Sequence, residues 1–149
     1  NYGSGRPPQG DYQTASMAVI EPADGRAKLT SSFAASSQVG IKVRGSSTSG
    51  RSKVSLSPEV QDEFGQDKNL ALLGMPNESD WVLWGPYNFD LTLMHNPFIF
   101  ELSRQIGRYA PRTRFVELYL NTGGNFASGH FNDLSFLFLL RFDLLAFQL

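Results

Sequence analysis

The sequence contains no cysteine among its 149 residues. The absence of thiols excludes disulfide bonds and thiolate metal sites. The two histidines, His95 and His130, are far apart and have no further metal ligands at a typical spacing around them. We therefore expect no zinc site.

An excess of either charge is also absent, since 13 Lys and Arg residues stand against 14 Asp and Glu residues. A dedicated nucleic-acid-binding domain carries a basic face, so we expect no nucleic acid among the partners. The net charge of -1 still permits a local cationic pocket for phosphate groups.

An uninterrupted apolar run of membrane-spanning length is missing as well. The most apolar run, "LSFLFLLRFDLLAFQL", is interrupted by Arg141 and Asp143. It is also shorter than the roughly 20 residues that a transmembrane helix needs, so we expect no membrane span. The sequence begins at Asn1 rather than Met, which indicates that the natural N-terminus lies upstream, and no signal peptide is visible.

Alternating apolar and polar residues are present and predict strands. Residues 1–16 are rich in Gly, Pro, Ser and Gln and are interpreted as a linker or irregular arm. Strands are expected in "MAVIEP", "VGIKVRG", "KVSLSPEVQDEF" and "TRFVELYLN". Pro58 is expected to end the pairing of the third strand or to lie at an edge, because it has no N–H to donate. The segment "LLGMPNESDWVLWGPYNFD", Leu72 to Asp90, is too broken for a long helix and is interpreted as an irregular aromatic connection.

The strongest helix pattern follows this connection. Asp90 is a plausible cap for a first turn, and Asn96 with Pro97 would cap and restart the helix. Gly107 is the expected end. An apolar stripe is formed by Phe98, Ile99, Leu102 and Ile106. The predicted fold class is α+β, a mostly antiparallel sheet with a packed helix.

A loop of small residues, Gly45 to Ser52, joins two of the expected strands. Small residues let backbone N–H groups approach a phosphate closely, and Arg44, Arg51 and Lys53 flank the loop with positive charge. The loop is not a Walker motif. An ordinary hairpin loop is the alternative interpretation.

Lys53 and Glu101 form a second candidate site. Lys53 is expected on the strand after the small-residue loop and Glu101 on the helix, the arrangement in which a kinase lysine binds phosphates and is held by a helix glutamate. Two solvated charges on separate faces are the alternative. A basic group could bind phosphate or carboxylate, or could instead be solvated or cap helix carbonyls, and consists of Arg104, Arg108, Arg112 and Arg114.

Three segments together resemble the CotH kinase family, the spore-coat protein H group. They are "IKVRGSSTSG", "LLGMPNESDWVLWGPYNFD" and "NPFIFELSRQIGRYAPRTRFVELYLNTGG", and the resemblance spans residues 39–124. The combination of "SDWVL" and "GPYNFD" with "ELSRQIGRYAPRTRFVE" is specific. The resemblance implies an atypical, secreted or surface-associated bacterial protein kinase that uses ATP and Mg²⁺ to phosphorylate serines of surface or spore-coat proteins.

The resemblance also implies roles for particular residues. The chain would form the small lobe, with the phosphates under the segment of Arg44, Gly45, Ser46 and Ser47. Lys53 would bind the phosphates and Glu101 would be its helix partner. Trp81 and Trp84 would fix the helix against the sheet, each through a buried area of roughly 150–250 Å². The expected location is extracellular, on the cell surface or in the spore coat.

Two departures from the family pattern limit these expectations. Family members often carry two adjacent lysines where this chain has Lys53 and Val54. After residues 17–124, read as a partial kinase domain, the family continues into a large lobe with the catalytic and Mg²⁺-binding aspartates. Residues 125–149 instead form an atypical apolar tail, which indicates a frameshift or truncation. We therefore expect the fragment itself to be inactive, with no catalytic or metal-binding residue. The alternatives are a non-catalytic surface or coat assembly or adhesion module, and a fragment that does not fold alone.

Overall fold

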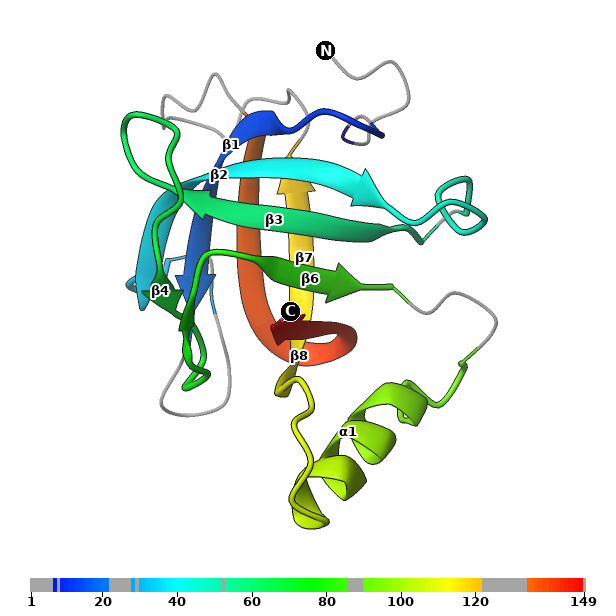
Figure 1. Ribbon diagram of the computed structural model, residues 1–149. Helices are drawn as coiled ribbons and strands as arrows, with labels where there is room; N and C mark the ends of the chain where they lie inside the picture. The colour runs from blue at the N-terminus through cyan, green and yellow to red at the C-terminus, as the bar shows by residue number, and fades with distance from the viewer. Residues whose placement is uncertain are drawn as a thin grey trace.

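The computed structural model describes residues 7, 9–21, 28, 30–51, 53–85, 90–121 and 134–148, with side chains as far as residue 120. One α-helix and eight strands occur in these ranges (Figure 1). Their bounds are β1 Gln13–Ile20, β2 Ala35–Arg44, β3 Ser55–Gln61, β4 Leu70–Ala71, β5 Asn77–Glu78, β6 Trp81–Trp84, α1 His95–Gln105, β7 Thr113–Asn121 and β8 Leu134–Gln148. The α+β class is confirmed, and no large lobe is present in the described part of the chain.

The main sheet has six strands in the order β1-β2-β3-β6-β8-β7. All pairings are antiparallel except that of β1 with β8, which is parallel. The first part of β8 lies beside β1 and its last part lies beside β6, as Figure 1 shows. The long strand β8 therefore closes the sheet on itself. Residues 134–148 of the expected atypical tail form this strand, and β1 starts inside the expected arm.

The core lies on the inner face of this sheet. Val39, Ile41 and Val43 alternate along β2 and are all buried, as the sequence predicts. Burying an aliphatic side chain of this size contributes about 1.5–3 kcal/mol. The largest fully buried side chains of the described part come from five strands: Val19, Ile20, Val39, Ile41, Val60, Val82, Leu83 and Val116.

Pro58 does not end β3, contrary to expectation. The strand runs through Pro58 to Gln61 and pairs with β2 along its whole length. The Val60 N–H donates to the Ser79 carbonyl on the β6 side. Because amide groups alternate along a strand, the nitrogen of Pro58 points to that side too. On that side, Pro58 lies between the Leu56–Leu83 pair and the Glu59–Asp80 bridge. Its missing N–H therefore removes no hydrogen bond between β3 and β2.

The segment expected to be irregular contains strand β6, whose two faces serve two apolar clusters. Trp81 and Leu83 are buried in the main core. Val82 faces the other side, where Trp84, Phe100 and Phe115 pack against it. Trp84 thus packs in the same cluster as Phe100 of α1, as the prediction for both tryptophans requires, whereas Trp81 does not. Trp81 is a core residue whose indole N–H donates to the Glu78 carbonyl.

A tight turn connects β4 to β5 and holds a strained leucine. Leu73 has φ 54° and Gly74 has φ 68°, and the Met75 N–H donates to the Leu72 carbonyl. Two positive φ angles at the central residues of a four-residue turn are typical of type I′, but a leucine rarely adopts this conformation. The buried Leu73 side chain and a hydrogen bond from Arg114 Nε to the Leu73 carbonyl hold it there.

Helix α1 begins at His95, two residues before the expected Pro97. Asn96 is therefore not its cap. The buried carboxylate of Asp90 instead accepts hydrogen bonds from the His95 N–H and the Thr92 hydroxyl. Burial, the largest single influence, would raise the pKa of Asp90, but these hydrogen bonds and the neighbouring His95 together lower it.

The helix ends at Gln105, and Gly107 terminates it as predicted. Gly107 has φ 77°, its N–H donates to the Arg104 carbonyl, and the Arg108 N–H donates to the Ser103 carbonyl. These two bonds with a left-handed glycine form a Schellman motif. The sequence therefore predicted the end of the helix better than its start.

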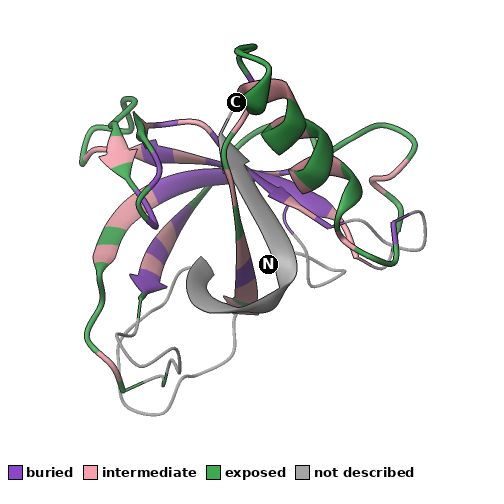
Figure 2. Ribbon diagram, turned by 90° about the horizontal axis from the view of Figure 1, so that it is seen from below, coloured by how far each residue is buried: buried purple, intermediate pink, exposed green. Residues whose placement is uncertain are grey.

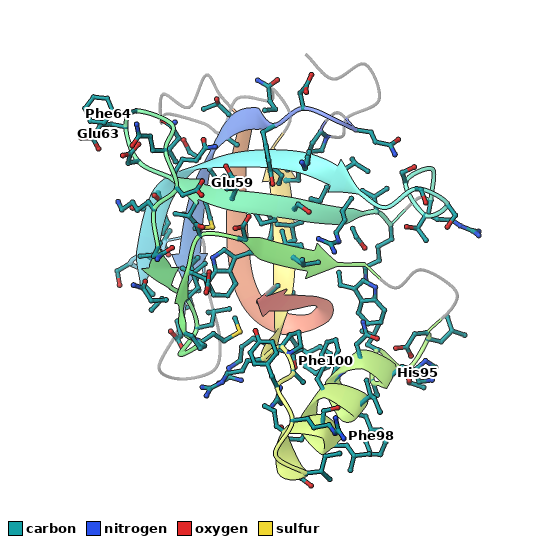
Figure 3. All side chains as sticks on the ribbon, viewed as in Figure 1. Glu59, Glu63, Phe64, His95, Phe98 and Phe100 are labelled. Carbon is teal, nitrogen blue, oxygen red and sulfur yellow. The ribbon has the colours of Figure 1, made fainter. Side chains whose placement is uncertain are left out.

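The apolar stripe of α1 does not face the sheet, contrary to the expected packing. Phe98, Ile99, Leu102 and Ile106 are all exposed, and no residue of α1 is buried (Figure 2). Phe100 supplies the apolar contact to the sheet. It lies on the side of the helix towards the sheet, whereas Phe98 lies on the other side (Figure 3). The 3.6-residue period identified an apolar face correctly but could not tell what covers it.

Candidate functional site

The loop between β2 and β3 begins with a sharp bend at Gly45. The last pair of the ladder joins Arg44 to Ser55, and Gly45 then takes φ 98°. A side chain at this position would also lie 2.3 Å from the Thr48 hydroxyl oxygen. Only glycine fits both the angle and the space. The bend leaves the polar segment exposed, with Arg44, Ser46 and Ser47 at the surface.

Hydrogen bonds within the loop hold its shape. The Ser49 hydroxyl donates to the Ser46 carbonyl over 2.8 Å, and the Arg51 N–H donates to the Thr48 carbonyl. From outside the loop, the Gln9 side-chain amide donates to the Gly45 carbonyl over 3.0 Å. The loop is thus an ordered turn rather than an extended hairpin tip. Gln9 lies in the range interpreted as an arm, and its sequence context gave no signal of this role.

Lys53 precedes β3 instead of lying on it, because the ladder with β2 ends at Ser55. Gly85 holds this stretch of chain in place. An added Cβ at Gly85 would lie 2.9 Å from the Val54 carbonyl oxygen and 3.1 Å from Lys53 Cγ. The Gly85 N–H donates to the buried Ser55 hydroxyl over 3.1 Å. The absence of a side chain at Gly85 therefore lets the end of β6 approach Lys53 closely. In the sequence, the "GPY" motif of the family pattern could have identified Gly85.

Glu101 has its partners on its own helix. Its carboxylate forms an ion pair with Arg104 and accepts a hydrogen bond from the Gln105 amide. The Arg104 hydrogen bond, then the Gln105 hydrogen bond and the Arg104 charge, lower the pKa of Glu101. The β2–β3 loop and α1 lie apart in Figure 1. The structure thus does not bring Lys53 and Glu101 together, and their pairing stays a prediction.

Arg104 and Arg114 bind different parts of the chain. Arg104 donates to the Pro111 carbonyl as well as to Glu101, which ties the end of α1 to the chain that follows. Arg114 donates to the carbonyls of Leu73 and Thr113. Arg108 lies beyond the end of the helix, so it does not share a helix face with Arg104. The motif "ELSRQIGRYAPR" thus contains the residues that terminate α1 and bind its last turn to the chain that follows.

No group of three or more His, Asp or Glu side chains that could hold a metal ion lies in the part of the chain described. Within that part, no helix has the length and apolar character needed to cross a bilayer. The loop flanked by Arg44, Arg51 and Lys53 is the best candidate site, because three cations beside a segment of small residues favour an anion as the ligand.

The comparison with known proteins agrees with the motifs. A model of the family described as CotH kinase protein matches residues 41–132, more than half of the chain. The matched range includes the bent loop, Lys53, Gly85 and the whole of α1. No curated protein and no solved structure matches the chain. On the strength of the family match, the chain belongs to the CotH kinase protein family.

Proposed function

We propose that this chain provides the nucleotide-binding small lobe of a CotH-type kinase that transfers phosphate from ATP to serines of surface or spore-coat proteins. One observation carries the proposal: a hydrogen-bonded loop, bent at Gly45 and flanked by Arg44, Arg51 and Lys53, lies within the residues that match the family model. The family resemblance implies that this segment covers the phosphates. Loops of small residues with exposed N–H groups and nearby cations favour phosphate binding.

The residues present fit the phosphate end of a nucleotide. Arg44 is exposed at the end of β2, and the Lys53 stem is fixed against Gly85, which limits the positions its ammonium group can reach. Arg44, Arg51 and Lys53 would bind the phosphates, with Gly45 and the serines Ser46 and Ser47 lining the loop. When bound, ATP supplies the phosphoryl group and Mg²⁺ neutralises its charge.

The residues that the structure describes do not fit a protein site for Mg²⁺. The described part of the chain contains no group of carboxylates able to hold a metal ion. The family resemblance places the catalytic and metal-binding aspartates in a large lobe, and none of the aspartates in this chain is assigned to that role. We therefore propose binding, without transfer, as the activity of this chain alone.

A second candidate function is a non-catalytic assembly or adhesion module for a surface or coat. The pairing of Glu101 with Arg104 favours it, because the glutamate that a kinase would direct at Lys53 is already satisfied within α1. Such a module has no need of Mg-ATP. Nucleotide binding therefore distinguishes the two functions.

Calorimetric titration of the chain with Mg-ATP tests the proposal. We expect saturable binding by the wild type and at least tenfold weaker binding by Lys53→Ala. Lys68→Ala is the matched control, because Lys68 is an exposed lysine on a different loop. It should bind like the wild type. Equal affinities for the wild type and Lys53→Ala would show that Lys53 is not part of the site. If the wild type bound no Mg-ATP, the assembly or adhesion module would be the better supported function.

A further inference from the structure

The exposed apolar face of α1 has the properties of an interface. We name as the α1 stripe the residues Met94, Phe98, Ile99, Leu102 and Ile106, which are 50%, 65%, 49%, 42% and 64% exposed. Their spacing of three, four or seven residues puts them on one side of the helix. The face runs the full length of α1, and Figure 2 colours the helix as exposed or intermediate throughout.

An uncovered helix of this length is at the limit of stability. Isolated helices shorter than about 12–15 residues are marginal in water, and α1 has 11 residues, none of them buried. Its ends are nevertheless well fixed, by Asp90 at the start and by Gly107 and the Arg104–Pro111 hydrogen bond at the end. The helix is therefore held ready to present an apolar face, and covering that face would stabilise it.

The apolar area of the stripe matches what a homodimer needs. If a large apolar residue exposes on the order of 200 Å² when fully accessible, within the range of about 150–250 Å² for aromatic side chains, the exposed fractions above give roughly 500 Å². A standard interface takes about 800 Å² from each partner, and homodimer interfaces are about 65% apolar, so each copy contributes about 500 Å² of apolar surface. The stripe is also at the upper end of the roughly 300–600 Å² that monomers expose in one patch.

We propose that the α1 stripe is a self-association surface, on which two copies of this chain pack helix against helix in antiparallel orientation. A twofold axis through the middle of the stripe makes the contact self-complementary and closed. Antiparallel packing also aligns the positive end of each helix dipole with the negative end of the other. The inference concerns a different surface from the nucleotide loop and does not depend on the proposed function.

The charges beside the stripe are compatible with this orientation. Glu101 and Arg104 neutralise each other within one copy. Arg108 and Arg112 follow the C-terminal end of the helix, so an antiparallel pair keeps the two basic ends about one helix length, roughly 16 Å, apart. That exceeds the screening length of about 8 Å at physiological salt. A parallel pair would bring the same arginines together.

Sedimentation velocity over a range of concentrations tests the proposal. We expect a monomer–dimer equilibrium in the wild type and at least a tenfold larger dissociation constant for Phe98→Asp. Phe64→Asp is the matched control, because Phe64 is 79% exposed and lies at the far end of the molecule from α1 (Figure 3). A wild-type monomer at every concentration, open-ended aggregation, or a dimer that Phe98→Asp leaves unchanged would overturn the proposal.

The cysteine-free sequence allows a second, geometric test. A single Ile99→Cys substitution puts one thiol near the middle of the stripe, where a twofold axis brings the two copies together. Packed helices lie 8–10 Å apart, which leaves facing Cα atoms within the about 4.4–6.8 Å that a disulfide spans. Mild oxidation should cross-link Ile99→Cys into a dimer at least tenfold faster than Phe64→Cys. Equal cross-linking of the two variants would contradict the helix pair.

Discussion

Gly85→Ala is the substitution whose effect the structure defines most closely. The new Cβ would lie 2.9 Å from the Val54 carbonyl oxygen, 3.1 Å from Lys53 Cγ and 3.3 Å from the Val54 carbonyl carbon. Two of these three atoms belong to the backbone and cannot rotate away. The chain at Gly85 has to retreat, and its hydrogen bond to the buried Ser55 hydroxyl lengthens as it does so.

The expected cost combines these two effects. Forcing an extra methyl group into a packed site costs about 1–3 kcal/mol, and weakening a hydrogen bond costs about 0.5–1.5 kcal/mol. We expect the free energy of unfolding to fall by about 2 kcal/mol, because a small shift of the chain relieves part of the overlap. For a chain of this length the melting temperature should fall by roughly 4–8 °C. The affinity for Mg-ATP should fall as well, because the Lys53 stem is displaced.

Urea unfolding and thermal melting measure the effect, with Gly50→Ala as the matched control. Gly50 lies in the adjoining loop, its φ is not in the left-handed region, and an added Cβ would meet no atom within 4 Å. It should change the free energy of unfolding by no more than about 0.5 kcal/mol. If Gly85→Ala were as stable as Gly50→Ala, the close approach of β6 to Lys53 would be refuted.

Three further predictions concern the core and the helix. Leu83→Ala should lower the free energy of unfolding in urea by about 2–5 kcal/mol, because Leu83 is fully buried; a loss below about 1 kcal/mol would refute its place in the core. The lowered pKa of Asp90 means that its stabilisation is complete above the ordinary aspartate pKa of about 3.9 and is lost as pH falls through the lowered value. Stability should therefore fall more steeply below about pH 4 in the wild type than in Asp90→Asn, and equal slopes would argue against the cap. Arg104→Ala should raise the pKa of Glu101 in an NMR titration, because the ion pair is the main cause of its lowering, and an unchanged pKa would show that the pair does not form.

Local patterns predicted the elements where one local cause decides the structure. The alternation of Val39, Ile41 and Val43 located β2 because one face of the strand is buried. Gly107 located the end of α1 because only a glycine readily takes the left-handed angle. The motifs predicted the family over residues 39–124, and the family model matches residues 41–132.

Other features depended on partners distant in sequence. Pro58 stays within β3 because the missing N–H falls in a gap of the β6 pairing. Asn96 and Pro97 resemble a helix start, but the helix begins earlier, at His95, whose N–H donates to Asp90, the residue that was expected to cap a first turn. The period of the α1 stripe indicated burial, whereas the sheet is contacted by Phe100 from the other side. Composition likewise gave no reason to expect that β8 closes the sheet.

The site itself was only partly visible in the sequence. The flanking cations Arg44 and Lys53 could be named from the pattern, but the two groups that position them could not. Gln9 and Gly85 lie 36 and 32 residues away from Gly45 and Lys53 along the chain. Their roles depend on how the strands pair, which no local pattern contains.

Hydrogen–deuterium exchange with and without Mg-ATP tests whether the β2–β3 loop and Lys53 form a nucleotide site, because it locates the bound nucleotide on the chain. With Mg-ATP we expect slower exchange in residues 45–51 and at Gly85, and no change in the loop of residues 62–66. Unchanged exchange in residues 45–51, or protection confined to another part of the chain, would contradict the claim that this loop and Lys53 form a nucleotide site.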